Sequence, residues 1–302
     1  MTEMFLYDEL SCLGSALLNE PLSAFTTFRT GGPAEILFEP AGEGELKAAL
    51  GLINRAGVSL TVIGGGSNLL VSDEGIRGVV VRIASDGAAP VYSEGLVYAD
   101  AGVSKENFIR FALDKGLGGV EFMAGVPGTV GGGIYMNAGT NMGSFSGILK
   151  NVRLLGPSGE ISTVSAVDSI SGYRSMALPE GSIILGGFFD LPRSADVPAV
   201  RKRVEEIIAG RWLKHPMEYP SAGSVFKNPE GHSSWKLIND SGLKGYSIGG
   251  AKVSEKHTNF IINTGSASSA DIYRLVKHVQ EKVYAGTGIM LETEIRLLGK
   301  FN

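Results

Sequence analysis

Residues 124–139 read AGVPGTVGGGIYMNAG, with six glycines and one proline in sixteen positions. Glycine tolerates positive φ and allows a ligand to touch the backbone. Apolar side chains stand between the glycines, at Val126, Val130, Ile134 and Met136. This pattern indicates an ordered loop that wraps a flat or phosphorylated ligand. A glycine-rich turn that only packs chain against chain is the alternative, and the stretch alone does not decide between them.

A second glycine-rich segment, GGGSN at residues 64–68, lies between two short apolar runs, 59–63 and 78–83. It is not a Rossmann fingerprint, because the residues that follow look extended rather than helical and a turn comes at once at 73–75. Successive backbone N–H groups in such a loop can form an anion-binding nest. We therefore expect a phosphate or pyrophosphate cradle here, with a purely structural turn as the alternative.

Composition sets bounds on the class of protein. The chain has 302 residues, 43 of them glycine, and a formal net charge of −4; its length alone favours about two domains. The net negative charge gives no sign of the basic surface that nucleic-acid-binding proteins carry. No apolar run reaches the roughly 20 residues of a membrane span, and no signal peptide is visible. Cys12 is a lone cysteine, and the four histidines lack metal-ligand spacing, so we expect a cytoplasmic protein without a metal site, a nucleic-acid partner or a membrane segment.

Hydrophobic periodicity and turn residues predict a mixture of helices and short strands. Predicted helices cover 1–20, 44–57, a segment from Ser104 as N-cap to Gly116, 199–214, 233–240 and 268–284. Predicted strands cover 35–39, 59–63, 78–83, 96–101, 152–155, 160–164, 182–191, 260–263 and 290–298, and the apolar run 182–191 is expected to be a central strand. The Pro-rich segment 192–198 is the best domain boundary. The fold class is therefore α+β.

Three side chains could carry chemistry. Arg174 offers a planar cation suited to carboxylate or phosphate. Ser224 lies outside a nucleophile elbow, because Phe226 stands where the second glycine belongs, yet its hydroxyl could donate a proton. Glu294 alternates with Glu292 on the last predicted strand, so both would share one face. A surface arginine, a turn-capping serine and a solvent face are the structural alternatives.

The order of these motifs resembles one known family, the UDP-N-acetylenolpyruvoylglucosamine reductases of peptidoglycan precursor synthesis. The matching blocks are TTFRTGGPAE (26–35), VIGGGSNLLVSDEGIRGVVV (62–81), GVEFMAGVPGTVGGGIYMNAG (119–139), GYRSM (172–176), PSAGSVFKNP (220–229), GGAKVSEKHTNFIIN (249–263) and LETEIRLLG (291–299). They follow the family order over nearly the whole chain.

The resemblance implies a vanillyl-alcohol-oxidase-type FAD-binding fold of two α+β subdomains over residues 1–192, divided near 84–90. A smaller α+β substrate domain would cover 198–302, with the strand 290–298 carrying Glu294 to the active site. FAD would be bound non-covalently by Gly64, Gly65, Gly66, Ser67, Asn68, Leu69, Gly128, Thr129, Gly131, Gly132, Asn137, Ala138 and Gly139. Lys227 and Asn228 would contact the nucleotide-sugar substrate.

The resemblance also implies a reaction in two halves. NADPH reduces FAD, and the flavin then delivers hydride to the enolpyruvyl ether of UDP-N-acetylglucosamine, giving UDP-N-acetylmuramate. Arg174 would stabilise the developing negative charge. Ser224 would protonate the α-carbon. Glu294 would act in its protonated form, since a bare carboxylate would repel an enolate.

Two features depart from the family pattern. Thr140-Asn141-Met142 follow Asn137-Ala138-Gly139, where many members have Ala-Tyr-Gly. The chain also resembles the subclass without the insertion that supplies a substrate-clamping tyrosine. Two other functions stay open: a flavin oxidase of the same fold acting on another alcohol or sugar, and a non-catalytic flavin or nucleotide-binding module. No obligate protein partner is evident.

Overall fold

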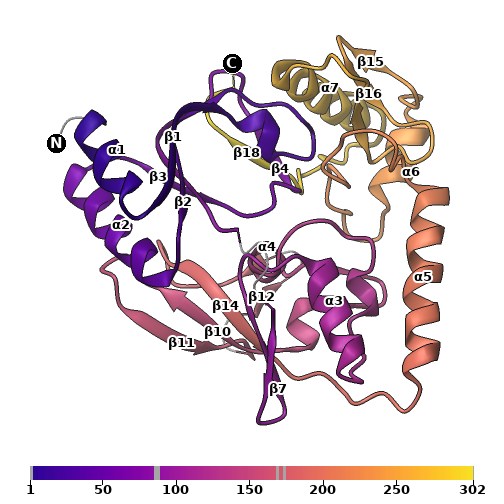
Figure 1. The fold of residues 1–302 in the computed structure, drawn as a ribbon. Helices are drawn as coiled ribbons and strands as arrows, with labels where there is room; N and C mark the ends of the chain where they lie inside the picture. The colour runs from indigo at the N-terminus through magenta and orange to yellow at the C-terminus, as the bar shows by residue number, and fades with distance from the viewer. Residues whose placement is uncertain (1–2, 85–88, 168–169, 173–174, 302) are drawn as a thin grey trace. The chain divides into compact units, whose positions relative to one another are not determined.

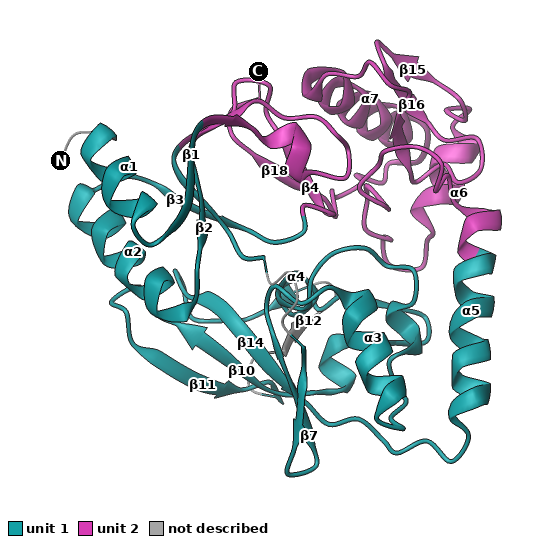
Figure 2. Ribbon diagram, viewed as in Figure 1, with its two compact units in different colours: residues 1–18, 36–65, 78–210 teal, residues 19–35, 66–77, 211–302 magenta. Residues whose placement is uncertain are grey.

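The computed structural model describes residues 3–84, 89–167, 170–172 and 175–301, and Figure 1 labels its helices and strands. The chain divides into two compact units, coloured separately in Figure 2. Unit 1 consists of residues 1–18, 36–65 and 78–210, and unit 2 of residues 19–35, 66–77 and 211–302. Each unit is therefore assembled from separate stretches of chain. The functional division at 192–198 stays a prediction, and the boundary expected near 84–90 falls partly on residues outside the described ones.

The first sheet has four strands in the order β1-β2-β5-β3, with β3 and β5 parallel. Their bounds are β1 Gly14–Pro21, β2 Pro33–Pro40, β3 Leu60–Ile63 and β5 Ile76–Arg82. Two helices, α1 Glu3–Ser11 and α2 Glu43–Ala56, pack together and share its apolar core in unit 1. The α2 helix ends as its sequence predicts, because Gly57 takes up a left-handed conformation with φ of 66°.

The second sheet is antiparallel, with five strands in the order β11-β10-β14-β7-β6. Their bounds are β6 Val91–Ser93, β7 Leu96–Asp100, β10 Leu149–Leu155, β11 Ile161–Ser165 and β14 Ile183–Phe189. The strands predicted at 152–155 and 160–164 are confirmed as β10 and β11, which pair as an antiparallel hairpin. The apolar run predicted to form a central strand is β14, which lies in the middle of this sheet.

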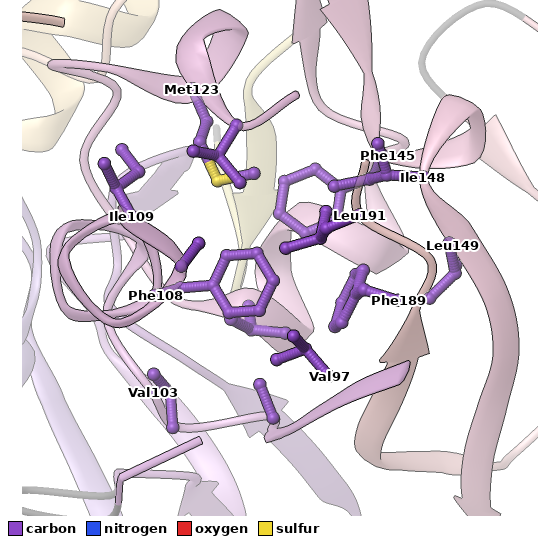
Figure 3. Close-up of a cluster of buried hydrophobic side chains, with 14 of the residues drawn as sticks. Val97, Val103, Phe108, Ile109, Met123, Phe145, Ile148, Leu149, Phe189 and Leu191 are labelled. Carbon is purple, nitrogen blue, oxygen red and sulfur yellow. The ribbon is translucent and has the colours of Figure 1, made fainter. Parts of the chain in front are cut away.

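A cluster of buried aromatic and aliphatic side chains forms the core behind this sheet, drawn in Figure 3. The ring of Phe189 on β14 lies 4.8 Å from that of Phe108 and 6.0 Å from that of Phe145, measured between centroids. Phe108 belongs to α3 Lys105–Asp114, whose N-cap is Ser104: the serine hydroxyl accepts the Asn107 N–H at 3.1 Å. The helix predicted from Ser104 is thus confirmed.

Shorter elements connect these layers. The remaining elements up to residue 214 are η1 Leu22–Phe25, η2 Glu121–Met123, α4 Val130–Tyr135, β8 Gly139–Thr140, β9 Gly143–Ser144, η3 Phe145–Gly147, β12 Ile170–Gly172, β13 Ser175–Met176 and α5 Val197–Lys214. The α4 helix lies inside the stretch 124–139, expected to be an ordered loop. The stretch is ordered, but residues 130–135 of it are helical.

Unit 2 has its own core. The sheet order is β15-β16-β17, and β4 pairs in parallel with β18. The bounds are β4 Leu69–Val71, α6 Ser234–Asp240, β15 Ser247–Ile248, β16 Ala251–Val253, β17 Ile261–Asn263, α7 Ser269–Thr287 and β18 Arg296–Leu298. The α7 helix buries Ile272, Leu275, Val276, Val279 and Val283, a spacing that keeps them on one face. Phe28 and Leu70 from early in the chain are fully buried in the same core.

Two predicted elements are wrong in extent. The helix expected over 1–20 stops at Ser11, and residues 14–21 form β1, whose side chains alternate between half-buried and exposed. The strand expected over 290–298 is restricted to Arg296–Leu298. Thr293 forms a single bridge to Phe226, and the Glu294 N–H bonds to the Val225 carbonyl. The backbone around residues 291–295 therefore binds a different segment and forms no regular ladder.

Candidate functional site

In unit 1 the two glycine-rich segments lie against each other. A Cβ at Gly65 would stand 3.1 Å from Gly128 Cα, and one at Gly64 would stand 2.7 Å from Thr129 Oγ1. Real Cβ atoms essentially never approach closer than 3.0 Å. Two stretches separated by some sixty residues thus meet backbone to backbone, as the expected cofactor-binding segments should. Packing of chain on chain contributes to the need for glycine here.

Close packing requires glycine at two positions of the α4 helix but not at a third. A Cβ at Gly131 would lie 2.7 Å from Ala101 Cβ, and one at Gly133 would lie 2.3 Å from the Phe145 ring. Among described atoms outside the helix's own nearby backbone, a Cβ at Gly132 would meet only Thr129 Oγ1, at 3.6 Å. That hydroxyl also caps the helix by accepting the Gly132 N–H at 3.3 Å. Gly132 therefore offers the open backbone that a flat ligand needs.

The segment after α4 is fixed by internal contacts. Asn137 has φ of 39°, and its side-chain oxygen accepts the Ser146 N–H at 3.0 Å. Ala138 accepts from Phe145 N–H at 3.0 Å, and Gly139 pairs with Ser144 in the β8–β9 hairpin. The departure Thr140-Asn141-Met142 forms the tip of this hairpin, where the Met142 N–H donates to Thr140 Oγ1. The unusual residues thus lie in a turn.

In unit 2 the continuation of the first loop is equally constrained. Gly66 has φ of 61°, and a Cβ there would lie 1.8 Å from the Phe25 carbonyl oxygen. Its own carbonyl accepts the Thr27 N–H at 3.2 Å. Ser67 and Asn68 follow, and Leu69 begins β4. Residue 66 must therefore be glycine for steric reasons alone.

The predicted catalytic residues Ser224 and Glu294 come from segments that bind each other within unit 2. The Glu294 N–H donates to the carbonyl of Val225, the residue after Ser224, at 2.7 Å. Ser224 itself pairs with Phe260 as an isolated bridge. Both side chains are partly buried. Asn68, predicted to contact the cofactor, donates from its amide to the Glu294 carbonyl at 3.0 Å.

The predicted substrate residues lie close by in sequence and near the surface. The Lys227 ammonium pairs with the Glu292 carboxylate at 3.2 Å. Glu292 is exposed and outside any strand, so it does not share a strand face with Glu294 as expected. Asn228 is exposed, and its side-chain oxygen accepts the Ser234 N–H at 3.0 Å. This bond fixes Asn228 at the start of α6.

Two supporting residues escaped the sequence analysis. Asn259 is 4% exposed, and its side chain makes two hydrogen bonds to the backbone of Phe226. Its amide oxygen accepts the Phe226 N–H at 3.0 Å, and its amide nitrogen donates to the Phe226 carbonyl at 2.8 Å. It holds the segment that carries Ser224, and its only signal was a polar residue before an apolar run. Lys105 is 5% exposed, and its ammonium donates to the Pro127 carbonyl at 2.9 Å beside the glycine-rich segment.

Buried basic groups lie next to the Ser224 segment. The His215 ring stacks on Phe260, with centroids 5.0 Å apart, and lies 5.2 Å from the His257 ring. Burial, and to a smaller extent the nearby positive charge of Arg211, lowers the pKa of His215 from 6.5 to about 4. Burial also lowers the pKa of His257 and that of Arg211. Both rings are therefore neutral at pH 7.

Arg174 lies outside the described residues, so its predicted place beside Ser224 and Glu294 stays a prediction. Among the described residues no cluster of three His, Cys, Asp or Glu side chains is arranged to hold a metal ion. Within the same part of the chain, no helix combines the length and the hydropathy needed to cross a membrane.

Comparison with known proteins now adds independent information. A family model for the FAD binding domain matches residues 34–165, and one for the C-terminal domain of UDP-N-acetylenolpyruvoylglucosamine reductase matches residues 215–298. The reductase of that name from Clostridium botulinum is 39% identical over 297 residues, covering 98% of this chain and 96% of the relative. The one from Geobacter metallireducens is 40% identical over 287 residues, covering 95% of each.

Solved structures agree. The crystal structure of UDP-N-acetylenolpyruvylglucosamine reductase from Thermus caldophilus matches with a TM-score of 0.80 and 32% identity, covering 95% of this chain and 99% of that one. The expected fold class, an α+β FAD-binding fold of the vanillyl-alcohol-oxidase type with a further C-terminal α+β domain, is thereby confirmed. The chain belongs to the UDP-N-acetylenolpyruvoylglucosamine reductase family.

Proposed function

We propose that this chain is an FAD-dependent oxidoreductase that uses NADPH to reduce the enolpyruvyl ether of UDP-N-acetylglucosamine to UDP-N-acetylmuramate. Membership of the family, over nearly the full length of its relatives, supports this activity. Within the chain, the observation that carries the proposal is the hydrogen bond from Glu294 N–H to Val225 O, because it brings the two predicted catalytic segments together.

The glycine-rich segments fit a flavin dinucleotide. FAD would be held by backbone and side-chain groups of two segments, Gly64–Leu69 and Gly128–Gly139, and the open side of Gly132 supports this assignment. When bound, FAD supplies the two-electron chemistry that amino-acid side chains lack. The protein's own contribution is to bind the reactants, orient them and move protons.

Ser224 is suited to supply the proton that completes the reduction. Its hydroxyl is partly buried and takes part in no hydrogen bond within the described part of the chain. It therefore need not break an internal bond to face a substrate. Its backbone is held by the bridge to Phe260 and by the neighbouring contact of Val225 with Glu294, so Ser224 Oγ is a proton donor on a fixed segment.

Glu294 would present a protonated carboxyl to the reacting carbon, and Arg174 would neutralise the charge that develops on the substrate carboxylate. Lys227 and Asn228 would bind the nucleotide sugar. Asn228 is exposed and Lys227 is half-buried, so both side chains can meet a ligand from solution. The Lys227 ammonium would have to exchange Glu292 for the substrate, and exposed ion pairs of this kind are worth only about 0–1 kcal/mol.

The proposal includes a cytoplasmic location, a small-molecule substrate and no obligate protein partner. The single cysteine, Cys12, supports the location, and the substrate named by the reductase relatives supports the small-molecule partner. These statements are independent of the site assignments.

The first experiment is the visible absorption spectrum of the purified protein, followed by anaerobic addition of NADPH and then of UDP-N-acetylglucosamine enolpyruvate. The expected protein is yellow, loses its colour with NADPH and regains it with the sugar nucleotide. Recovery only with oxygen would favour a flavin oxidase. A protein that takes up no FAD would overturn the assignment of both glycine-rich segments.

A further inference from the structure

Asn68 makes two different contacts with the segment around Glu294, both within unit 2. Its carbonyl accepts the Arg296 N–H at 2.9 Å, and its side-chain amide donates to the Glu294 carbonyl at 3.0 Å. The two bonded residues flank Ile295, whose side chain is 2% exposed. One asparagine thus holds the backbone on both sides of a buried anchor.

These contacts extend the parallel pairing of β4 with β18 by one step. The regular register starts at Leu69 opposite Arg296. In a parallel ladder, every second residue of a strand bonds through its N–H and C=O to the two residues that flank its partner on the neighbouring strand. At residue 68 the C=O follows this pattern, but the side-chain amide takes the place of the backbone N–H.

Because the side-chain amide binds the Glu294 carbonyl, the backbone N–H of Asn68 takes no part in the ladder. Among the described residues, that N–H donates no hydrogen bond. It follows Gly66 and Ser67 in the loop assigned to the pyrophosphate, where successive N–H groups can form an anion nest. Asn68 can therefore serve the cofactor with its backbone and Glu294 with its side chain at the same time.

The two peptide groups that flank the Glu294 Cα are therefore each held by a different residue. Its N–H is bound by the Val225 carbonyl at 2.7 Å, and its C=O by the Asn68 amide at 3.0 Å. Positions 68 and 294 are 226 residues apart in sequence. With both peptides held and Ile295 buried beside them, these contacts help to set the Cα–Cβ direction of Glu294.

We propose that Asn68 is a positioning residue for Glu294, so that one residue serves the cofactor loop with its backbone and the Glu294 segment with its side chain. The inference rests on the proposed function, because it takes Glu294 as catalytic. Loss of the amide should loosen Glu294 and slow substrate reduction. It should leave reduction of the flavin by NADPH nearly unchanged, since that half-reaction does not use Glu294.

The test compares Asn68→Ala with Asn54→Ala, each measured as FAD-loaded enzyme. Asn54 is a matched control, because its amide also donates to a backbone carbonyl, that of Pro157, at 2.8 Å, but far along the chain from the site. Rapid-mixing absorbance gives the rate of each half-reaction. We expect Asn68→Ala to slow flavin reoxidation by the enolpyruvyl sugar nucleotide about tenfold, which is less than the roughly 100-fold loss that a misplacement of about 1 Å can cause. Flavin reduction should stay within about twofold of wild type. Asn54→Ala should change neither rate.

A double-mutant cycle with Glu294→Gln provides the decisive readout. If Asn68 acts through Glu294, adding Asn68→Ala to Glu294→Gln should slow reoxidation no further. Equal additional slowing in both backgrounds would refute the positioning role. The Kd for FAD, measured from flavin fluorescence, reports separately on the backbone role and should change less than the reoxidation rate.

The outcomes also separate this inference from the proposed function. If Glu294→Gln and Glu294→Ala both reoxidise at the wild-type rate, the catalytic assignment of Glu294 fails, and the inference fails with it. If they are slow while Asn68→Ala is normal, only the positioning role fails. Should Asn68→Ala not retain FAD at saturating concentration, Asn68→Ser, which keeps a polar group on Cβ, is measured in the same cycle and judged by the same criteria.

Discussion

Gly132 and Gly133 are neighbours in α4 whose missing side chains would meet different surroundings. A methyl group at Gly133 would overlap the buried Phe145 ring, whereas one at Gly132 would have space. Gly133→Ala should therefore lower the free energy of unfolding by about 3 kcal/mol through overpacking. Gly132→Ala should leave it unchanged or raise it by up to about 1 kcal/mol, because alanine favours helix.

The pair separates folding from cofactor binding. If Gly132 faces FAD, as proposed, Gly132→Ala should weaken FAD binding at least tenfold despite its intact stability, since a Cβ would fill space that a flat ligand needs. Urea unfolding of the FAD-free protein and titration with FAD measure the two effects. Wild-type FAD affinity in Gly132→Ala would remove this glycine from the cofactor site.

A single-residue change at Ser224 should affect the chemical step rather than stability or FAD binding. Ser224→Ala should leave the reduction of bound flavin by NADPH intact and slow its reoxidation by the sugar nucleotide at least about a hundredfold, because general-acid contributions are commonly of that size. Ser221→Ala, which removes a hydroxyl three residues earlier, serves as the control. Equal slowing of both half-reactions by Ser224→Ala would argue that the serine supports the site rather than donating a proton.

At the scale of elements, the N-terminus of α7 is bound by a residue from far earlier in the chain. The Asp73 carboxylate accepts the N–H groups of Ser269 and Ala270, each at 2.8 Å. Ser268 and Asp271 complete a capping box. The first turn of the helix is thus satisfied by side chains, and α7 is tied to the turn that follows β4.

This double contact predicts a graded loss of stability. Asp73→Ala removes two bonds to the helix N-terminus and should cost about 2 kcal/mol, whereas Asp196→Ala removes one bond, to Ala199 at the start of α5, and should cost about 1 kcal/mol. Thermal unfolding of both variants, monitored by circular dichroism, checks the order. Equal costs would show that the second Asp73 bond contributes nothing.

Elements with local signals were predictable from the sequence, and those defined by distant partners were not. The α2 and α3 helices carry their own caps, and the β10–β11 hairpin carries its own turn. The segment 291–295 alternates like a strand, but its backbone bonds to residues near 225, and sequence alone does not reveal that pairing. For the same reason, Ser224 and Glu294 could be proposed individually, while the contact of Asn68 with the Glu294 carbonyl could not.

At the scale of the whole molecule, residues 211–302 of unit 2 depend on the two earlier stretches of the same unit, 19–35 and 66–77. Phe28 and Leu70 are fully buried in its core, and the Asn263 amide donates to the Phe28 carbonyl at 2.9 Å. A fragment of residues 211–302 should therefore show no cooperative thermal transition, although it contains both α6 and α7. A sharp transition with native-like circular dichroism would contradict this dependence.

Acid sensitivity is a second whole-molecule property, and it follows from His215. Because the pKa of His215 is lowered from 6.5 to about 4 in the folded protein, the unfolded chain binds the proton more readily. The contribution of neutral His215 to the free energy of unfolding is fully present above pH 6.5. It decreases as the pH drops towards 4 and is lost below that. Allowing for solvent screening, His215 should account for about 2 kcal/mol of this loss.

The measurement is urea unfolding between pH 4 and pH 7 for wild type and His215→Gln, with the exposed His232→Gln as control. The difference in unfolding free energy between wild type and His215→Gln should change across this range, while His232→Gln should run parallel to wild type. Parallel curves for His215→Gln would show that this histidine is not kept neutral by its surroundings.

The steric need for glycine at positions 66, 131 and 133 also bears on drug resistance. A side chain at any of them would collide with Phe25, Ala101 or Phe145, so these positions cannot vary without damage to the fold. An inhibitor that draws its affinity from the backbone of these segments would touch groups that no single substitution can remove. Resistance would have to arise at side chains that reach solvent, such as the half-buried Lys227 and the exposed Asn228, where change costs the fold less.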